Sequence, residues 1–279
     1  MANWLKNQYV ILTGASGGIG KALCKILIEK YDAKVVGIGR NEQKMQALQT
    51  ELGDKAAQFS YRLFDVAEKE NWLSFRQWLQ EEGITPKLLI NNAGAFPVFA
   101  KTLDTSSGTF ERIMKINYLS AVYAAETLSP LLVGDKKNKP AIVNICSSAA
   151  LCTIAGTAAY SASKGALKGY TEALQLDEKG KKYVGIVYPG TTATDLFRED
   201  ENTKNSALDK IAMSPYKMAK KIAKRIYRRK KRSVVGWDAK LMNLTAKVAP
   251  VKGVALIRWV MKKSKSKVFT EVFDYSKKK

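Results

Sequence analysis

The stretch Tyr9-Val-Ile-Leu-Thr13, followed directly by Gly14-Ala-Ser-Gly-Gly-Ile-Gly20, decides the fold of this 279-residue chain. The apolar run predicts a buried strand, and the helical pattern after the glycines predicts a helix. Gly14 permits a tight turn, Gly18 lets the backbone approach a pyrophosphate, and Gly20 lets helix and strand pack closely. Because a helix N-terminus offers free N–H groups and the positive end of a dipole, the turn predicts a phosphate-binding loop.

Strands and helices alternate along the rest of the chain. Short apolar runs predict strands at residues 34–39, 59–64, 88–90, 141–146 and 184–188. Helical patterns lie between them at residues 42–52, 72–79, 110–132 and 158–177. Repeated strand–helix–strand units form a parallel sheet that is covered on both faces. The sequence therefore predicts a doubly wound α/β fold, with one domain over residues 1–238 and a basic C-terminal extension over residues 239–279.

The amino-acid composition excludes several kinds of catalytic and metal site. The chain has 46% hydrophobic and 26% charged residues and contains no histidine. Ser-His-Asp catalysis, Cys-His catalysis and histidine-ligated metal sites are therefore excluded, and another side chain must carry the proton of any reaction. The three cysteines are scattered in apolar stretches, which favours small reduced core residues over a disulfide framework or a zinc site. We expect no metal.

The charge is concentrated near the C-terminus. The formal net charge is +22, and residues 204–279 contain 23 lysines and arginines but only 4 acidic residues. Such asymmetry indicates an anionic membrane surface or a nucleic acid as partner, although a merely soluble charged surface explains it equally well. The N-terminal residues lack the pattern of a signal peptide, and no uninterrupted run of about 18 apolar residues occurs, so we expect a cytoplasmic location.

Further motifs follow the glycine loop in a fixed order: Asn91-Asn-Ala-Gly94, Asn117, Ser147, Tyr160-Ser-Ala-Ser-Lys164 and Pro189-Gly190. Together these motifs resemble the short-chain dehydrogenase/reductase family over roughly residues 8–195. The resemblance implies a Rossmann fold and hydride transfer between a nicotinamide cofactor and an alcohol/carbonyl pair. Each motif alone is weak evidence, whereas their order on the predicted elements is specific.

Reduction of a ketone needs a hydride donor and an acid that protonates the developing alkoxide. Tyr160 can supply that proton, and Lys164 lies one helical turn later on the same face. Because an ammonium favours the phenolate, we expect Lys164 to lower the pKa of Tyr160 from its ordinary value of about 10. The resemblance implies that Lys164 also holds the nicotinamide ribose and that Ser147 hydrogen-bonds the substrate oxygen. It further implies that Asn117 kinks its helix and anchors a proton-relay water.

The resemblance also assigns a cofactor site. It implies contacts from Gly14, Ser16, Gly18, Ile19, Gly20, Asn91, Ala93, Gly94, Tyr160 and Lys164. Pro189, Gly190 and Thr194 match the loop that faces nicotinamide. Asp65 matches the acid that contacts the adenine amine, and a helix N-cap is the alternative role for Asp65.

The end of the second predicted strand indicates which dinucleotide is used. Members that use NAD carry an acid there to bond the ribose hydroxyls, whereas this chain has Gly39 followed by Arg40. Without the acid nothing repels a 2′-phosphate, and a guanidinium can hold the phosphate bidentately. Ser16 could add a hydroxyl, although Gly17 stands where a basic residue or serine is common. We therefore predict NADP(H).

The loop after Gly190, to about Met213, points to the substrate. It mixes Leu196, Phe197 and Leu208 with the charged residues 198–201, so it could close over an apolar ligand. Segments 109–118, 158–164 with 172–175, and 248–251 are similar to 3-ketosphinganine reductases, which reduce a long-chain ketone at a membrane. Hydroxysteroid dehydrogenases are similar over the core. We expect a lipid-like ketone or alcohol first and a steroid second, and a small polar ketone or sugar stays open.

The basic C-terminal quarter also allows a function other than catalysis. The basic C-terminal quarter could belong to an anion-binding, nucleic-acid-associated or scaffolding protein on a reductase fold. Retention of the glycine loop, Ser147, Tyr160 and Lys164 argues against lost catalysis, so we expect an enzyme and no nucleic-acid partner.

Two stretches of the C-terminal quarter combine apolar and basic residues. Residues 214–232 show a helical pattern whose apolar face we expect to pack on the sheet, with the basic face in solvent. Residues 241–263 are harder to absorb into a core, because Pro250 and Gly253 break them into pieces that are too short and too charged to span a bilayer. Trp, Leu and Ile flanked by lysines suit an anionic membrane surface. The alternatives are a cover over the substrate cleft or a subunit contact, and the family resemblance suggests homo-oligomers.

Overall fold

The computed structural model describes residues 3–194, 196 and 212–273. A seven-stranded sheet with the order β3-β2-β1-β4-β5-β6-β7 forms its centre, and each neighbouring pair is parallel. The strands are β1 (Tyr9–Thr13), β2 (Lys34–Gly39), β3 (Phe59–Leu63), β4 (Pro86–Asn91), β5 (Ala141–Ile145), β6 (Tyr183–Pro189) and β7 (Arg232–Val235). The chain order reverses between β1 and β4, so the predicted doubly wound α/β fold is confirmed.

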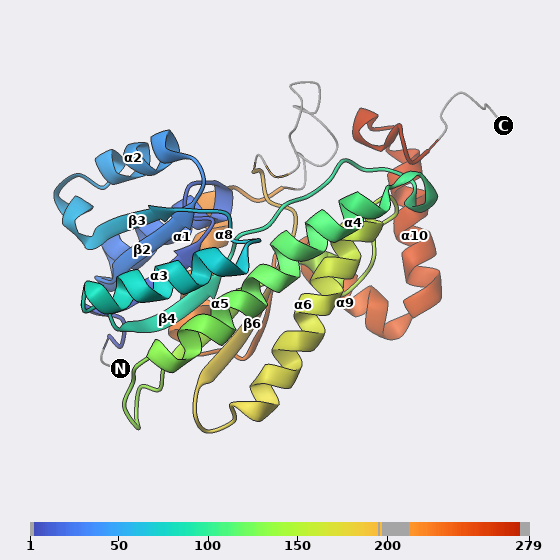
Figure 1. Cartoon of the computed structure of the whole chain (residues 1–279). Coiled ribbons are helices and arrows are strands. Elements are labelled where there is room, and N and C mark those ends of the chain that lie inside the picture. The colour runs from blue at the N-terminus through green and yellow to red at the C-terminus, as the bar shows by residue number, and fades with distance from the viewer. Residues whose placement is uncertain (1–2, 195, 197–211, 274–279) are drawn as a thin grey trace.

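Helices cover both faces of the sheet (Figure 1). On one face, α1 (Gly18–Tyr31), α2 (Glu42–Glu51) and α8 (Pro215–Tyr227) share a buried apolar cluster with the strands. On the other face, α3 (Lys69–Glu81), α5 (Ser120–Leu128) and α6 (Ala158–Asp177) pack on the sheet. The apolar residues of α8 are buried and its lysines are exposed, as its sequence pattern predicts.

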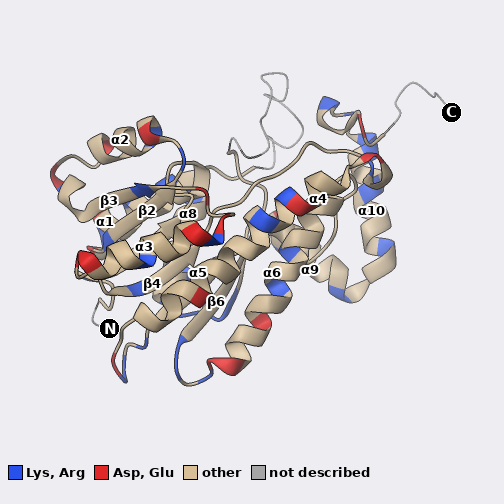
Figure 2. Ribbon diagram, viewed as in Figure 1, with Lys and Arg blue, Asp and Glu red and all other residues tan. Residues whose placement is uncertain are grey.

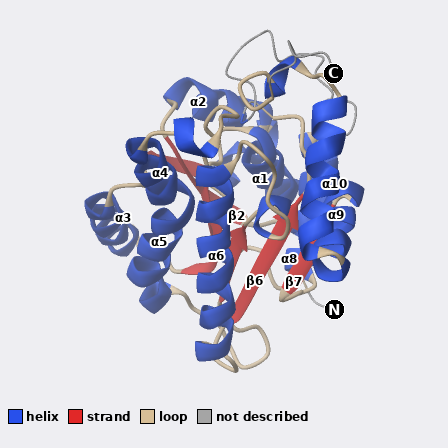
Figure 3. Ribbon diagram, turned by 90° about the vertical axis from the view of Figure 1, so that its right-hand side faces the viewer, coloured by secondary structure: helices blue, strands red, loops and turns tan. Residues whose placement is uncertain are grey.

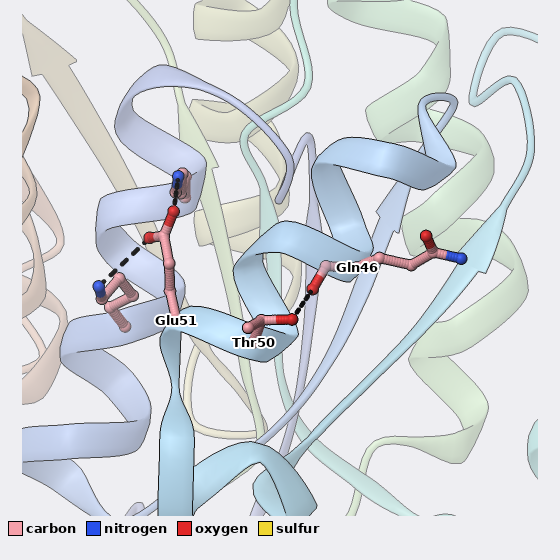
Figure 4. Close-up of polar contacts among 5 residues, drawn as sticks. Gln46, Thr50 and Glu51 are labelled. Carbon is pink, nitrogen blue, oxygen red and sulfur yellow. Dashed lines mark hydrogen bonds and ion pairs between the residues drawn. The ribbon is translucent and has the colours of Figure 1, made fainter.

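An ion-pair cluster joins the end of α2 to α1 (Figure 4). The Glu51 carboxylate accepts hydrogen bonds from Lys21 at 2.6 Å and from Lys25 at 3.4 Å, and the Lys21 bond is the main cause of the lowered pKa of Glu51. The preceding residue, Thr50, donates from Oγ1 to the Gln46 carbonyl one turn earlier, at 3.1 Å. The ion pairs hold α2 against α1, and α1 begins directly after the glycine loop.

The helix predicted over residues 110–132 is interrupted. It starts earlier, as α4 (Ser107–Met114), and continues through a π-helical turn at Lys115–Leu119 into α5. A 3₁₀ turn at Ser129–Leu131 ends it. The π turn places Asn117 at the centre of the interruption, and such turns are frequent at functional sites.

Strand β7 was not predicted, because the helical pattern of residues 214–232 includes its first residue. The helix α8 stops at Tyr227, and Arg229 adopts a left-handed conformation with φ of 50°. The chain then turns back, so that Arg232–Val235 pairs with the end of β6. Four residues that begin with an arginine carry too little apolar pattern to indicate a strand.

Two helices follow β7 and lie side by side beyond the edge of the sheet (Figure 3). They are α9 (Trp237–Val248) and α10 (Pro250–Lys263), so the predicted boundary at 238/239 falls in the first turn of α9. Pro250 starts α10, but the expectation that Gly253 breaks the segment is wrong. A Cβ at Gly253 would collide with the Thr245 side chain, so this glycine allows the two helices to cross closely. Among the described helices, none has the length and apolar character needed to cross a bilayer.

Candidate active site

A cavity of about 450 Å³ opens at the carboxyl ends of β1 and β4, where the strand order reverses. This is the position at which open α/β sheets bind ligands. Most of the predicted site residues line it: Gly14, Ser16, Gly18, Ile19, Arg40, Asp65, Ala93, Gly94, Ser147, Tyr160, Lys164, Pro189, Gly190 and Thr194. The predicted residues that do not line it are Gly20, Asn91 and Asn117.

The glycine loop leaves the start of α1 accessible. Gly14 and Gly18 have φ values of +65° and +47°, and a Cβ on Gly18 would lie 2.8 Å from the Thr194 side chain. Around Gly17, a Cβ would meet nothing within 4 Å, so the backbone faces open space at the first turn of the helix. Gly20 lies against the Gly14 carbonyl instead, which gives it the predicted role in packing and no contact with the cavity.

Thr13 ties the glycine loop to the end of β4. Its hydroxyl accepts hydrogen bonds from the backbone N–H groups of Asn92 and Ala93, at 2.9 and 2.8 Å. In return, the Asn92 side chain donates to the carbonyls of Thr13 and Gly14 at 3.0 and 3.4 Å. The sequence motifs contain both residues, yet their roles were missed, because the hydrogen bonds join segments that are almost 80 positions apart.

Asn117 continues this network toward the catalytic helix. Its side chain makes two hydrogen bonds to the backbone of Ala95, at 2.7 and 2.9 Å, and donates to Ser163 Oγ at 3.0 Å. Ser163 in turn donates to the Tyr160 carbonyl at 2.7 Å. Asn117 therefore fastens the π turn to α6 and to the segment after β4 through three hydrogen bonds.

Tyr160, Ser147 and Lys164 meet at the inner end of the cavity. Tyr160 is 5% exposed and is hydrogen-bonded to Ser147, while Lys164 Nζ donates to the Ile145 carbonyl at 3.2 Å. Burial raises the pKa of Tyr160 to about 12, and the Ser147 hydrogen bond offsets part of the rise. Burial also lowers the pKa of Lys164.

The expectation that Lys164 lowers the pKa of Tyr160 is therefore wrong for this structure. Lys164 Nζ lies 5.9 Å from the centre of the tyrosine ring and is directed to a backbone carbonyl. Both groups are taken out of water, and loss of hydration disfavours the charged form of each. At neutral pH the geometry thus presents Tyr160 as a protonated phenol, which is the form that can act as an acid.

The opposite end of the cavity is basic. Arg40 Nη1 lies 3.5 Å from Asp65 Oδ2, and both side chains line the cavity. Lys44 also lines it, from the first turn of α2, where the Asn41 side chain caps the helix by accepting from the Lys44 N–H. Lys44 was missed in the sequence, although the capping asparagine three residues earlier indicated the helix start. Asp65 accepts from the Ala67 N–H and is not the N-cap of α3, which is Glu68.

Two further residues hold the framework of the site. Asn91 is buried in the sheet, where it donates to Asn144 Oδ1 at 2.8 Å, so this contact stabilises the sheet centre. Asp238, which the sequence did not indicate, accepts from the Thr191 N–H and packs on Gly190. It comes from α9 and fastens the predicted nicotinamide-facing loop. The rest of that loop, including the predicted apolar residues Phe197 and Leu208 and the charged residues 198–201, lies outside the described residues.

A cavity that joins a phosphate-binding loop to a buried tyrosine–lysine pair is the arrangement of a nicotinamide-dependent oxidoreductase. Such an enzyme acts on an alcohol/carbonyl pair, with tyrosine as the proton carrier. In the part of the chain that the structure describes, no group of three or more His, Cys, Asp or Glu side chains is placed to hold a metal ion.

Comparisons with known proteins agree with this class. The family model described as short chain dehydrogenase matches residues 8–205. The 3-ketodihydrosphingosine reductase of Bos taurus is 30% identical over 265 residues, which cover 90% of this chain and 78% of that protein. The chain therefore belongs to the short-chain dehydrogenase family, and it is an oxidoreductase that acts on CH–OH or C=O groups.

Two further similarities extend the comparison. The 3-dehydrosphinganine reductase of Danio rerio is 27% identical over 262 residues, which cover 90% of this chain and 78% of that protein. Among solved structures, a short chain dehydrogenase from Burkholderia cenocepacia in complex with NADP is 22% identical, with a TM-score of 0.74. The match covers 91% of this chain and 98% of that one, and it shows the fold.

The raised pKa of Tyr160 predicts different pH dependences for the two reaction directions. Reduction needs the phenol, which is the dominant form well below a pKa of about 12, whereas alcohol oxidation needs the phenolate. We expect kcat/KM for oxidation to rise about tenfold per pH unit between about pH 6 and 9, while kcat/KM for reduction stays nearly flat. Initial rates with one alcohol/ketone pair in both directions measure this. A falling oxidation rate over that range would contradict the assignment of Tyr160.

Proposed function

We propose that this protein is an NADP(H)-dependent reductase of a lipid-like ketone, of the 3-ketosphinganine type. The observation that carries the proposal is the position of Tyr160. Its ring lines the nucleotide-sized cavity on one side and belongs to a buried apolar cluster on the other. A ketone that places its carbonyl at the Tyr160 hydroxyl would therefore extend its remaining groups along apolar side chains.

NADP(H) fits the residues of the cavity. The open backbone at Gly17 and the start of α1 offers N–H groups to a pyrophosphate. Arg40, Lys44 and Ser16 line the adjoining part, where they would hold a 2′-phosphate. Gly190 and Thr194 also line the cavity, with Thr194 against Gly18, and the nicotinamide would lie between these residues and Tyr160. The volume of about 450 Å³ is within the usual range for cofactor sites.

The chain's own residues then carry the proton chemistry. When bound, the cofactor supplies the hydride. Tyr160 donates its phenolic proton to the carbonyl oxygen as charge develops there, and the Ser147 hydroxyl, already bonded to Tyr160, orients that oxygen. Lys164, whose Nζ donates to the Ile145 carbonyl, would bind the nicotinamide ribose.

Replacement of Tyr160 tests the reaction. We expect Tyr160→Phe to lower kcat by about 10²–10⁴-fold, because the proton donor is lost, while NADPH affinity changes little. Lys164→Ala should lower both kcat and NADPH affinity, because Lys164 would hold the nicotinamide ribose and so position the hydride donor. Ketone-dependent NADPH oxidation and NADPH fluorescence titration provide the two readouts, with a panel of a long-chain 3-ketone, a steroid ketone and a sugar.

Two results would contradict this proposal. Near-normal turnover in Tyr160→Phe would remove the tyrosine from the chemistry. Absence of NADPH binding to the wild-type protein would instead favour the non-enzyme alternative, an anion-binding protein on a reductase fold.

Cofactor preference can be tested at Arg40. A Cβ on Gly39 would lie 2.5 Å from the Met45 methyl group, so introducing an acid there would disturb packing, and removal of the guanidinium is the cleaner change. We expect Arg40→Leu to lower the ratio of kcat/KM for NADPH over NADH by roughly 10- to 100-fold, because charge-assisted hydrogen bonds to the phosphate are lost. Lys30→Leu, at the far end of α1, serves as the control. An unchanged ratio would show that the phosphate is recognised elsewhere.

An anionic membrane surface is the proposed partner of the α9–α10 pair. Trp237, Leu241, Leu244 and Val248 recur at helical spacing along α9, and each is at least half exposed. On α10, the exposed apolar residues are Val251, Leu256, Trp259 and Val260, and basic residues flank them (Figure 2). A helix pair with an apolar stripe, tryptophans and lysines suits the headgroup boundary of a bilayer. A peripheral location would bring the enzyme to a lipid-like ketone.

Vesicle cosedimentation tests this partner. We expect binding to phosphatidylserine/phosphatidylcholine vesicles at low salt, weakened at high salt because each basic residue near the surface contributes about 1 kcal/mol. The triple variant Leu241→Ser, Leu244→Ser and Trp259→Ser should bind at least about tenfold less. A matched variant of the basic face of α8, with Lys220, Lys221 and Lys224 changed to Ser, should bind nearly as the wild type does. Equal binding of all three proteins, or a dimer that the first variant dissociates, would favour non-specific charge or a subunit contact.

A further inference from the structure

The residues after α10 belong to the same buried apolar cluster as Tyr160. We call residues 266–273 the C-terminal strap, whose Phe269 and Phe273 are each only 3% exposed. Together with Met261 they join the buried apolar cluster that contains Tyr160. The family match ends at residue 205, so these contacts arise from a part of the chain that the family pattern does not describe.

A continuous series of aromatic rings connects the strap to Tyr160. The Phe269 ring meets Phe99 edge-to-face with centroids 5.1 Å apart, Phe99 contacts Phe96 at 4.8 Å, and Phe96 contacts Tyr160 at 5.0 Å. Phe273 extends the series beyond Phe269, at 6.4 Å. These offset and edge-to-face arrangements are the favourable geometries for aromatic packing. The strap is therefore in contact with the side chains that surround the reacting hydroxyl.

Two segments of the body carry the strap. Gly156 has a φ of +78°, and a Cβ there would collide with the Val272 side chain, so the strap sits directly on this glycine. The Gly156 carbonyl accepts from the Ala100 N–H at 3.2 Å, which joins the segment before α6 to the segment that carries Phe96 and Phe99. The strap thus contacts both segments, at Gly156 and at Phe99.

Apolar contacts join residues 266–272 of the strap to the body, and Arg258 of α10 lies over the Phe273 ring at 5.5 Å from its centroid. Among the described residues, the hydrogen bonds made by residues 265–272 all stay within residues 262–273. An apolar ligand can take the place of such contacts without leaving a buried polar group unpaired. A hydrocarbon chain is a ligand of that kind, because it replaces one apolar neighbour by another.

We infer that the C-terminal strap, with Met261, is the wall against which the alkyl chain of the ketone lies, and that Phe269 sets the preferred chain length. The inference rests on the proposed function, since it places the carbonyl at Tyr160. The nucleotide side of the cavity is lined by the glycine loop and Thr194, so the rest of the ketone extends past Tyr160 and Leu196, and Leu196 packs on the same cluster.

A series of methyl ketones from 2-butanone to 2-decanone tests the wall. With NADPH, kcat/KM of the wild-type enzyme should rise about twofold to fourfold per methylene until the alkyl chain extends beyond the strap. Phe269→Ala should lower kcat/KM for 2-decanone at least about tenfold and leave 2-butanone within about twofold. Phe269→Leu, which keeps a large apolar residue in the wall, should retain most of the preference for 2-decanone.

Leu176→Ala is the control, because it removes an exposed apolar side chain at the end of α6 opposite to Tyr160. It should follow the wild-type profile. Circular dichroism and NADPH affinity show whether each variant is folded. A uniform loss at every chain length in Phe269→Ala, or a wild-type profile that does not depend on chain length, overturns the inference and leaves the reductase proposal standing.

Calorimetric titration of 2-decanone separates the inference from the proposed function. If the wild-type protein reduces no ketone, the proposed function fails, and binding alone decides the role of the strap. Affinity for 2-decanone that weakens at least about tenfold in Phe269→Ala, and not in Leu176→Ala, supports the wall. Equal affinity in both variants, or no binding to the wild type, overturns it.

Discussion

The hydrogen bonds of Thr13 are the constraint on which the site depends. They hold the ends of β1 and β4 together at the one place where the chain order of the sheet reverses. From there the connection continues through Ala95 and Asn117 to Ser163 and so to the backbone of Tyr160. The phosphate-binding loop and the catalytic helix thus share one polar framework, and neither can shift without the other.

The chemistry of the site arises from a balance between burial and hydrogen bonding. Burial opposes charge on both Tyr160 and Lys164, which keeps the tyrosine in its acid form. Ser147 acts in the other direction, because its hydrogen bond to Tyr160 offsets part of the rise in pKa; in the proposed reaction this would help the proton to leave as charge develops on the ketone oxygen. The same desolvation strengthens every electrostatic contact made there during reaction.

The sequence predicted local features well and long-range contacts poorly. Apolar runs and glycine spacing located six strands, and the ordered motifs located Ser147, Tyr160 and Lys164 at one cavity. Periodicity could not show β7, which is short and begins with an arginine, nor the sheet-stabilising contact of Asn91 with Asn144. It also could not show that burial outweighs the effect of Lys164 on Tyr160, because burial depends on side chains such as Phe96 and Phe269 that approach from distant segments.

The α9–α10 pair is anchored to the active site at both of its ends. Asp238 at its start holds the Thr191 backbone, and Met261 near its end packs in the cluster around Tyr160. Between these anchors the helices are mostly exposed. The exposed middle of the pair can therefore differ in sequence with little effect on the cavity. If the pair docks on a membrane as proposed, exchange of that stretch for one of different polarity would change the surface that the enzyme binds and leave the cavity unchanged.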